Sequence, residues 1–91
     1  MPENSEASIT LPGDLHARPA GALSVAAAGF TSTVQVAVGG GASVDAKSVL
    51  SVMQLGASSG QEVTVRAVGA DAQEAVDTLI GILSSASKVG D

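Results

Sequence analysis

The chain has no cysteine, tryptophan or tyrosine, and Phe30 is its one phenylalanine. Without cysteine it can form no disulfide scaffold, zinc–thiolate site, iron–sulfur centre or cysteine nucleophile. With a single aromatic side chain, it cannot bind nucleic acids mainly by stacking bases on aromatic rings. These absences exclude several classes of small protein and identify none.

Basic residues are also scarce: four Lys and Arg stand against nine Asp and Glu, for a net charge of −5. Arg18, Lys47, Arg66 and Lys88 are too few to form a basic patch for phosphate backbones, so we expect no nucleic-acid partner. The one histidine, His16, has no cysteine or acidic cluster at ligand spacing, and we therefore predict no metal site.

Long apolar runs are missing as well. No run approaches the roughly 18 residues of a membrane-spanning helix, and residues 1–6 are polar and acidic, unlike a signal peptide. We expect a cytoplasmic protein with no membrane insertion. The 91 residues fit one domain, with residues 1–5 flexible. Most of the apolar residues are alanine and valine, which predicts a core in which helices pack closely on a sheet.

Apolar periodicity and turn residues predict seven elements. We expect strands at Ala7–Leu11, Thr33–Val38 and Glu62–Val68, with a weak edge strand at Ala42–Val44. We expect helices at Ala17–Ala28 and at Lys47–Leu55, the second with Ser48 as N-cap. A third helix should run from a capping box at Asp71 and Glu74 to about Ser87. This order predicts an α+β open-faced sandwich: a four-stranded antiparallel sheet with three helices on one face.

His16 lies at the predicted start of a helix, after a turn marked by Pro12 and Gly13. A helix N-terminus carries unpaired N–H groups and partial positive charge, which disfavour an imidazolium and favour an anion. A neutral imidazole is a nucleophile, and Arg18 is close enough in sequence to bind phosphate oxygens. Together these residues suit reversible phosphoryl transfer through a phosphohistidine.

Other interpretations of these residues remain open at this point. A lone histidine before a helix is often only a surface or capping residue. A Ser-His-Asp triad is formally possible, but nothing in the sequence places a serine and an aspartate beside His16. The Gly39–Gly41 run lacks the Lys-Ser/Thr of a phosphate-binding loop.

Two segments resemble one family. Residues 15–20, Leu-His-Ala-Arg-Pro-Ala, resemble the active-site motif of the histidine-containing phosphocarrier (HPr) family of the bacterial phosphotransferase system, and residues 46–56 resemble its regulatory-serine helix. The resemblance covers about residues 6–88. It implies a phosphocarrier that receives a phosphoryl group from Enzyme I on His16 Nδ1 and passes it to the EIIA component of a sugar transporter. Such a carrier is not an enzyme, needs no cofactor and is expected to be a monomer.

The resemblance also implies roles for other residues. Arg18 and the backbone N–H groups near Ala17 would stabilise the transferring phosphate. In regulated relatives a kinase phosphorylates the serine matched by Ser48, which would add a kinase/phosphorylase and a transcriptional regulator as partners; alternatively, Ser48 only caps its helix. The alternative function within the family is a carrier of the regulatory branch, for nitrogen or carbon control, which acts through protein–protein contacts.

A partner-binding patch is expected beside the active-site turn. Val49, Leu50 and Met53 cannot all face a core from so short a helix, and an exposed apolar patch would suit docking. Lys47 and Arg18 are the two cations expected near this interface, and the helix from Gly21 to Gly29 has no charge. Many relatives carry several lysines there, so we expect docking here to depend more on apolar contact than on electrostatic steering.

Overall fold

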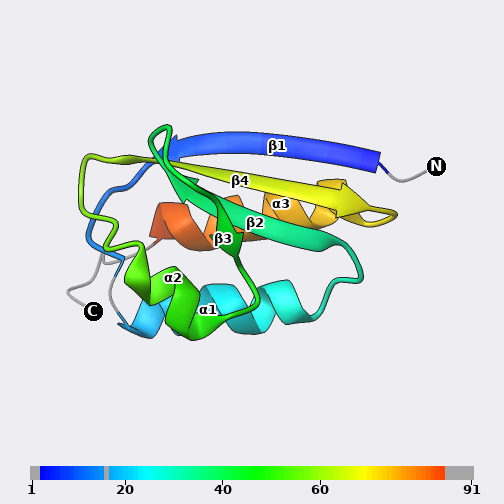
Figure 1. Cartoon of the computed structure of the whole chain (residues 1–91), viewed down its shortest axis with the longest axis horizontal. Coiled ribbons are helices and arrows are strands. Elements are labelled where there is room, and N and C mark those ends of the chain that lie inside the picture. Colours follow the sequence, from blue (N-terminus) through cyan, green and yellow to red (C-terminus); the bar gives the residue numbers. More distant parts are fainter. Residues whose placement is uncertain (1–2, 16, 86–91) are drawn as a thin grey trace.

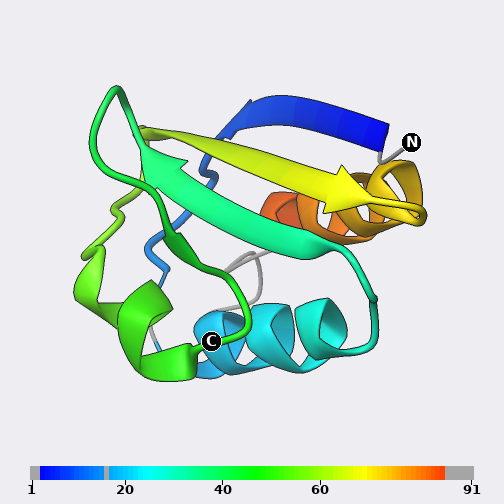
Figure 2. The same cartoon turned by 45° about the vertical axis from the view of Figure 1, so that its right-hand side comes forward.

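The computed structural model describes residues 3–15 and 17–85 (Figure 1). Its elements in chain order are β1 (Glu3–Thr10), α1 (Ala17–Ala28), β2 (Thr33–Val38), β3 (Val44–Asp45), α2 (Val49–Gln54), β4 (Glu62–Gly69) and α3 (Ala72–Ser85). The strands form one four-stranded sheet in the order β1-β4-β2-β3, and every neighbouring pair is antiparallel. All three helices lie on one face of the sheet (Figures 1 and 2). The predicted fold class is confirmed.

Strand β1 starts earlier than the sequence predicts. It pairs with β4 along its whole length, from Glu3 opposite Gly69 to Thr10 opposite Glu62. The expectation of a flexible segment over residues 1–5 is therefore wrong for residues 3–5; residues 1 and 2 lie outside the described residues. The sequence conceals this part of β1 because residues 3–6 are all polar, so that backbone pairing and not apolar alternation defines the strand.

Helix–sheet packing determines where the functional elements lie. The inner face of the sheet contributes fully buried valines, and α1 and α3 contribute alanines and leucines with no exposed surface. The residues at 0% exposure are Ala20, Leu23, Ala27, Val34, Ala46, Val52, Val63, Val65, Ala67, Ala72, Ala75, Leu79 and Leu83. As predicted, small side chains form much of the core. The outer face of the sheet is polar and includes the hydrogen-bonded hydroxyls of Ser8 and Thr64, 2.7 Å apart.

A polar network joins the start of α3 to the connection between α1 and β2. The Asp71 carboxylate accepts from the backbone N–H groups of Thr31 and Ser32, both at 2.9 Å, and from the Ser32 hydroxyl. Gly69 lies against this network at φ 149°, where an added Cβ would be 2.5 Å from Ser32 Oγ. Asp71 therefore stabilises a connection distant in sequence, and these bonds replace the capping-box pairing predicted with Glu74.

The same hydrogen bonds lower the pKa of Asp71. The Ser32 hydroxyl and the Thr31 N–H stabilise the ionised carboxylate and bring its pKa from 3.8 to about 2. A depressed folded-state pKa stabilises the fold above the unfolded-state value, and this contribution is lost as the pH falls through the folded-state value. Asp71 thus makes the fold sensitive to acid below about pH 4.

We predict that Asp71→Asn lowers the free energy of unfolding at pH 7 and removes part of its decline between pH 4 and pH 2. Asparagine cannot carry the charge that the Thr31 and Ser32 donors stabilise. Urea unfolding measured at several pH values over this range tests the prediction. Asp77→Asn, which removes an exposed carboxylate from the same helix, is the control and should keep the wild-type slope. An unchanged slope in Asp71→Asn would contradict the assignment.

Candidate functional site

The turn at residues 11–15, which leads into position 16, is held against the loop at residues 57–61. Leu11 N donates to Gln61 O, Gly60 N donates to Leu11 O, and Leu15 N donates to Ala57 O, each at 2.9 Å. The Leu11 and Leu15 side chains are buried in the core. His16, the predicted nucleophile, lies outside the described residues. The main chain on its N-terminal side is anchored to both the core and the 57–61 loop.

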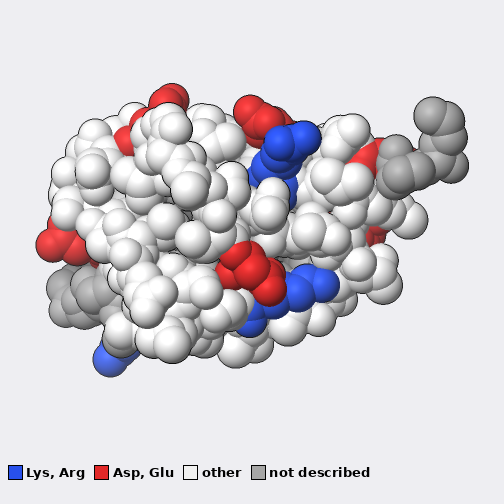
Figure 3. All heavy atoms as spheres, viewed as in Figure 1, with Lys and Arg blue, Asp and Glu red and all other residues white. Residues whose placement is uncertain are grey.

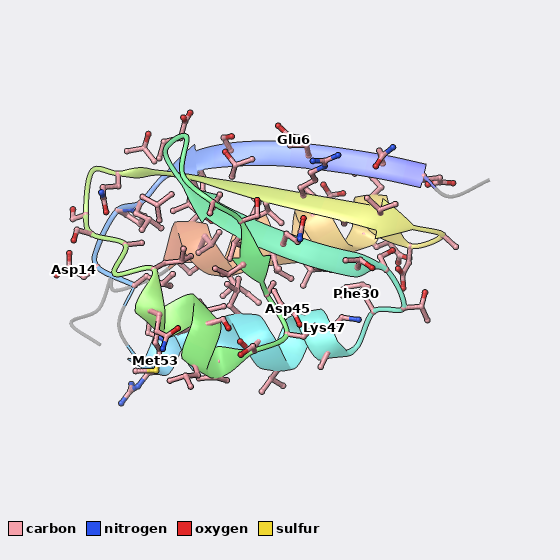
Figure 4. All side chains as sticks on the ribbon, in the orientation of Figure 1. Glu6, Asp14, Phe30, Asp45, Lys47 and Met53 are labelled. Carbon is pink, nitrogen blue, oxygen red and sulfur yellow. The ribbon has the colours of Figure 1, made fainter. Side chains whose placement is uncertain are left out.

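Two further bonds join the same two segments on the surface. The Asp14 carboxylate accepts from Ser59 N at 2.8 Å, and the Ser59 hydroxyl donates to Pro12 O at 3.4 Å. Asp14 lies at the end of the molecule where the turn passes between sheet and helices (Figure 4). The 11–15 turn therefore bonds to the 57–61 loop at both ends and in its middle.

Helix α1 begins at Ala17, directly after position 16. Its first N–H groups have no carbonyl to bond within the helix, and Pro19 in the first turn has no N–H to leave unpaired. The first turn contains no acidic residue. The N-terminus of a helix carries partial positive charge, which favours an anion close to it.

Arg18 lies at the edge of a groove of about 400 Å³ between α1 and α3. The groove is also lined by Pro19 and Ala22 from α1 and by Thr78, Gly81, Ile82 and Ser85 from α3. Arg18 itself is exposed, whereas Pro19 and Ala20 are buried. The helix thus fixes its first turn through Pro19 and Ala20 and leaves the Arg18 side chain at the surface.

Ser48 is the N-cap of α2, as predicted. Its backbone is extended, and its hydroxyl oxygen accepts from Ser51 N at 3.2 Å. This bond satisfies one of the N–H groups that a helix start leaves unpaired. Ser48 is half-buried, which leaves part of its surface accessible.

Lys47 connects the start of α2 to the end of α1. Its ammonium donates to the carbonyl oxygen of Phe30 at 2.9 Å, and its backbone N–H donates to Asp45 Oδ1 at 2.9 Å (Figure 4). Phe30 follows the last turn of α1, where partial negative charge favours a cation. The sequence did not indicate this contact. This hydrogen bond gives Lys47 a structural role that is separate from its expected role in partner binding.

The apolar residues predicted to form a docking patch are exposed. Val49, Leu50 and Met53 expose 41%, 67% and 42% of their surface, while Val52 on the same helix is fully buried. We call these three residues the α2 patch. Val25 on α1 is exposed by 75% and was missed. The helical repeat places Val25 on the side of α1 opposite the fully buried Leu23 and Ala27, and this spacing was the signal available in the sequence.

Charged side chains are spread over the face drawn in Figure 3 without a large patch of either sign. Within residues 3–15 and 17–85, no three metal-ligating side chains come together. No helix of the same region is long and apolar enough to span a membrane. The described part of the candidate site comprises a turn, two helix starts and an apolar patch.

Comparison with known proteins gives this arrangement a family. The family model for the HPr component phosphorylation site of the phosphotransferase system matches residues 4–85. This chain belongs to the HPr family of phosphocarrier proteins. The match includes both segments that resembled the family, residues 15–20 and 46–56.

Individual HPr relatives agree. The chain is 41% identical over 71 residues to phosphocarrier protein HPr of Cupriavidus necator, covering 78% of this chain and 79% of that protein. It is 39% identical over 85 residues to a multiphosphoryl transfer protein of Xanthomonas campestris, covering 93% of this chain and only 10% of that protein's length. A solved histidine-containing phosphocarrier protein from Mycoplasma superposes with a TM-score of 0.78 at 28% identity, over 98% of this chain and 100% of that one.

Proposed function

We propose that this chain accepts a phosphoryl group on His16 from phosphorylated Enzyme I and passes it to EIIA components of sugar transporters. The observation that carries the proposal is the position of residue 16, between an anchored turn and the N-terminus of α1, in a chain of the HPr family. The proposal treats residues 1–91 as one cytoplasmic carrier domain. It exchanges the phosphoryl group with other proteins, so it needs no enclosed pocket.

The proposed chemistry uses few groups. The imidazole of His16 attacks phosphorus, the bond from phosphorus to the Enzyme I donor breaks, and a P–N bond to Nδ1 forms. The backbone N–H groups at Ala17 and Arg18 and the Arg18 guanidinium stabilise the anionic oxygens of the transferring group. Transfer to EIIA reverses the process and regenerates the free imidazole. The carrier therefore works as a substrate of its partners and not as an enzyme.

Incubation with phosphoenolpyruvate and a matched Enzyme I should add the mass of one phosphoryl group. Mild acid should remove it, because a phosphorus–nitrogen bond is acid-labile. Intact-mass spectrometry before and after acid measures both steps. His16→Ala should gain no mass while keeping the wild-type circular dichroism spectrum. A wild-type chain that gains no mass with a competent Enzyme I would rule the carrier function out.

Ser48 is proposed as a second, regulatory phosphorylation site. Its N-cap position supports this, because a phosphate there would meet the positive end of the α2 backbone. The added negative charge would lie at the start of the helix that carries the α2 patch and would weaken apolar docking. A kinase/phosphorylase and a transcriptional regulator would then join Enzyme I and EIIA as partners.

We expect an HPr kinase with ATP to add one acid-stable phosphate that is absent from Ser48→Ala. The phosphorylated protein should then receive phosphoryl groups from Enzyme I more slowly than the unmodified protein. Ser51→Ala, which alters the hydroxyl of the next serine on α2, is the matched control and should still be modified. Acid-stable phosphate on Ser48→Ala would place the modification elsewhere.

The α2 patch is proposed as the docking surface, with Lys47 directly before its helix. Its support is the exposure of three large apolar side chains on a six-residue helix whose Val52 alone is buried. Arg18 and Lys47 are the two cations expected near this surface, so little positive charge is available there for long-range steering. Docking should therefore depend mainly on apolar burial.

The association rate with Enzyme I should change little, by roughly twofold at most, between low and high salt. Leu50→Ser should raise the KM of Enzyme I for this carrier, because Leu50 exposes the most surface in the patch. Thr64→Ser, on the outer face of the sheet, is the control. Stopped-flow transfer at several sodium chloride concentrations measures both effects. A steep fall in rate with salt would mean that charge steers the encounter.

A further inference from the structure

Asp14 makes a contact that spans 45 residues of sequence and joins two surface segments. Its Oδ1 accepts from Ser59 N at 2.8 Å. Both residues are exposed, so neither group needs this bond to offset burial. A charge-assisted bond of this kind is shorter and stronger than a neutral one. It fixes geometry more than it stabilises the core.

The bond acts where the turn is otherwise least constrained. Leu11 and Leu15 are anchored by backbone bonds and by buried side chains, but Pro12, Gly13 and Asp14 lie between them at the surface. Glycine at position 13 gives this part of the turn unusual backbone freedom. Among the described residues, and apart from the long Ser59 Oγ contact to Pro12 O at 3.4 Å, the bond that holds the middle of the turn comes from the Asp14 carboxylate.

The partner loop is itself ordered, so it can serve as a support. Ser58 N donates to Gln61 Oε1 at 2.7 Å, and Gln61 N donates to Ser58 O at 3.0 Å. Ala57 is buried, and the loop leads directly into β4. Asp14 therefore bonds to a segment that is fixed by its own hydrogen bonds and by the sheet.

We propose that Asp14 is a positioning residue for phosphoryl transfer. It acts through the 11–15 turn: by fixing Asp14 to Ser59 N, it restricts the backbone that leads through Leu15 into His16. The inference rests on the proposed function, in which the imidazole must meet the incoming phosphorus in one orientation. Misplacement of a reacting group by about 1 Å can cost roughly a hundredfold in rate, so a modest loosening of the turn is enough to matter.

A through-space effect of the Asp14 charge is the alternative, and two variants separate it from positioning. Asp14→Asn removes the charge and keeps an oxygen that can accept from Ser59 N. Asp14→Ala removes both. Asp77→Ala removes an exposed carboxylate of α3, which accepts from Gln73 Nε2 at 2.8 Å, and controls for the change in net charge.

The experiment measures transfer from phospho-Enzyme I with each carrier as the varied substrate. Asp14→Ala should lower kcat roughly tenfold and leave KM within about twofold, because docking uses the α2 patch. Asp14→Asn should stay within about threefold of wild type, since the acceptor oxygen is retained. Asp77→Ala should match wild type. Hydrogen exchange at the Ser59 amide should accelerate in Asp14→Ala and remain slow in Asp14→Asn.

Each outcome supports or overturns the positioning role of Asp14 or the proposed function. If wild type takes up phosphoryl groups and Asp14→Ala transfers them equally fast, the positioning role is wrong and the proposed function stands. An equal fall in kcat for Asp14→Asn and Asp14→Ala would assign the effect to charge and overturn positioning. A fall in both kcat and Ser59 protection only in Asp14→Ala supports the inference. A wild-type chain that takes up no phosphoryl group overturns the proposed function itself.

Discussion

Close packing of alanine and valine side chains between two helices and a sheet is the constraint on which the rest of the structure depends. Ala20 and Ala27 of α1 and Ala72 and Ala75 of α3 have no exposed surface. Their short side chains let each helix lie near the sheet, and close-packed interiors leave little room for adjustment. The N-terminus of α1 is consequently held at a defined place relative to the strands. A site at that N-terminus is therefore held in place by the packing of the core.

The site itself is built from connections and not from a cavity. Bonds between the 11–15 turn and the 57–61 loop hold the chain on one side of position 16, and the first turn of α1 holds it on the other. The start of α2 is tied to the end of α1 through Lys47 and Phe30. This arrangement suits a carrier, because a partner must reach the reacting group from outside.

The sequence predicted most of this arrangement, and its failures have physical reasons. The alternating valines of β2 and β4 and the N-cap at Ser48 were predictable because local patterns encode them. The early start of β1 was hidden, since polar residues 3–6 form a strand only through pairing with β4. Lys47–Phe30 and Asp14–Ser59 join residues far apart in the chain, and no local pattern encodes such contacts. The hydrogen bonds of Asp71 to Thr31 and Ser32 were not predicted for the same reason, although the local spacing correctly marked Asp71 as the start of a helix.

The Lys47–Phe30 contact has a consequence for how the sequence can vary. The acceptor is a main-chain carbonyl, which every amino acid carries, whereas the donor is a side chain of particular length and charge. Replacing the side chain at position 30 therefore keeps the acceptor, but replacing position 47 removes the donor. The hydrogen bond that links α1 and α2 therefore depends on the side chain at position 47 and not on the side chain at position 30. Substitution at position 30 is limited only by packing, while substitution at position 47 removes the hydrogen bond between the end of α1 and the start of α2.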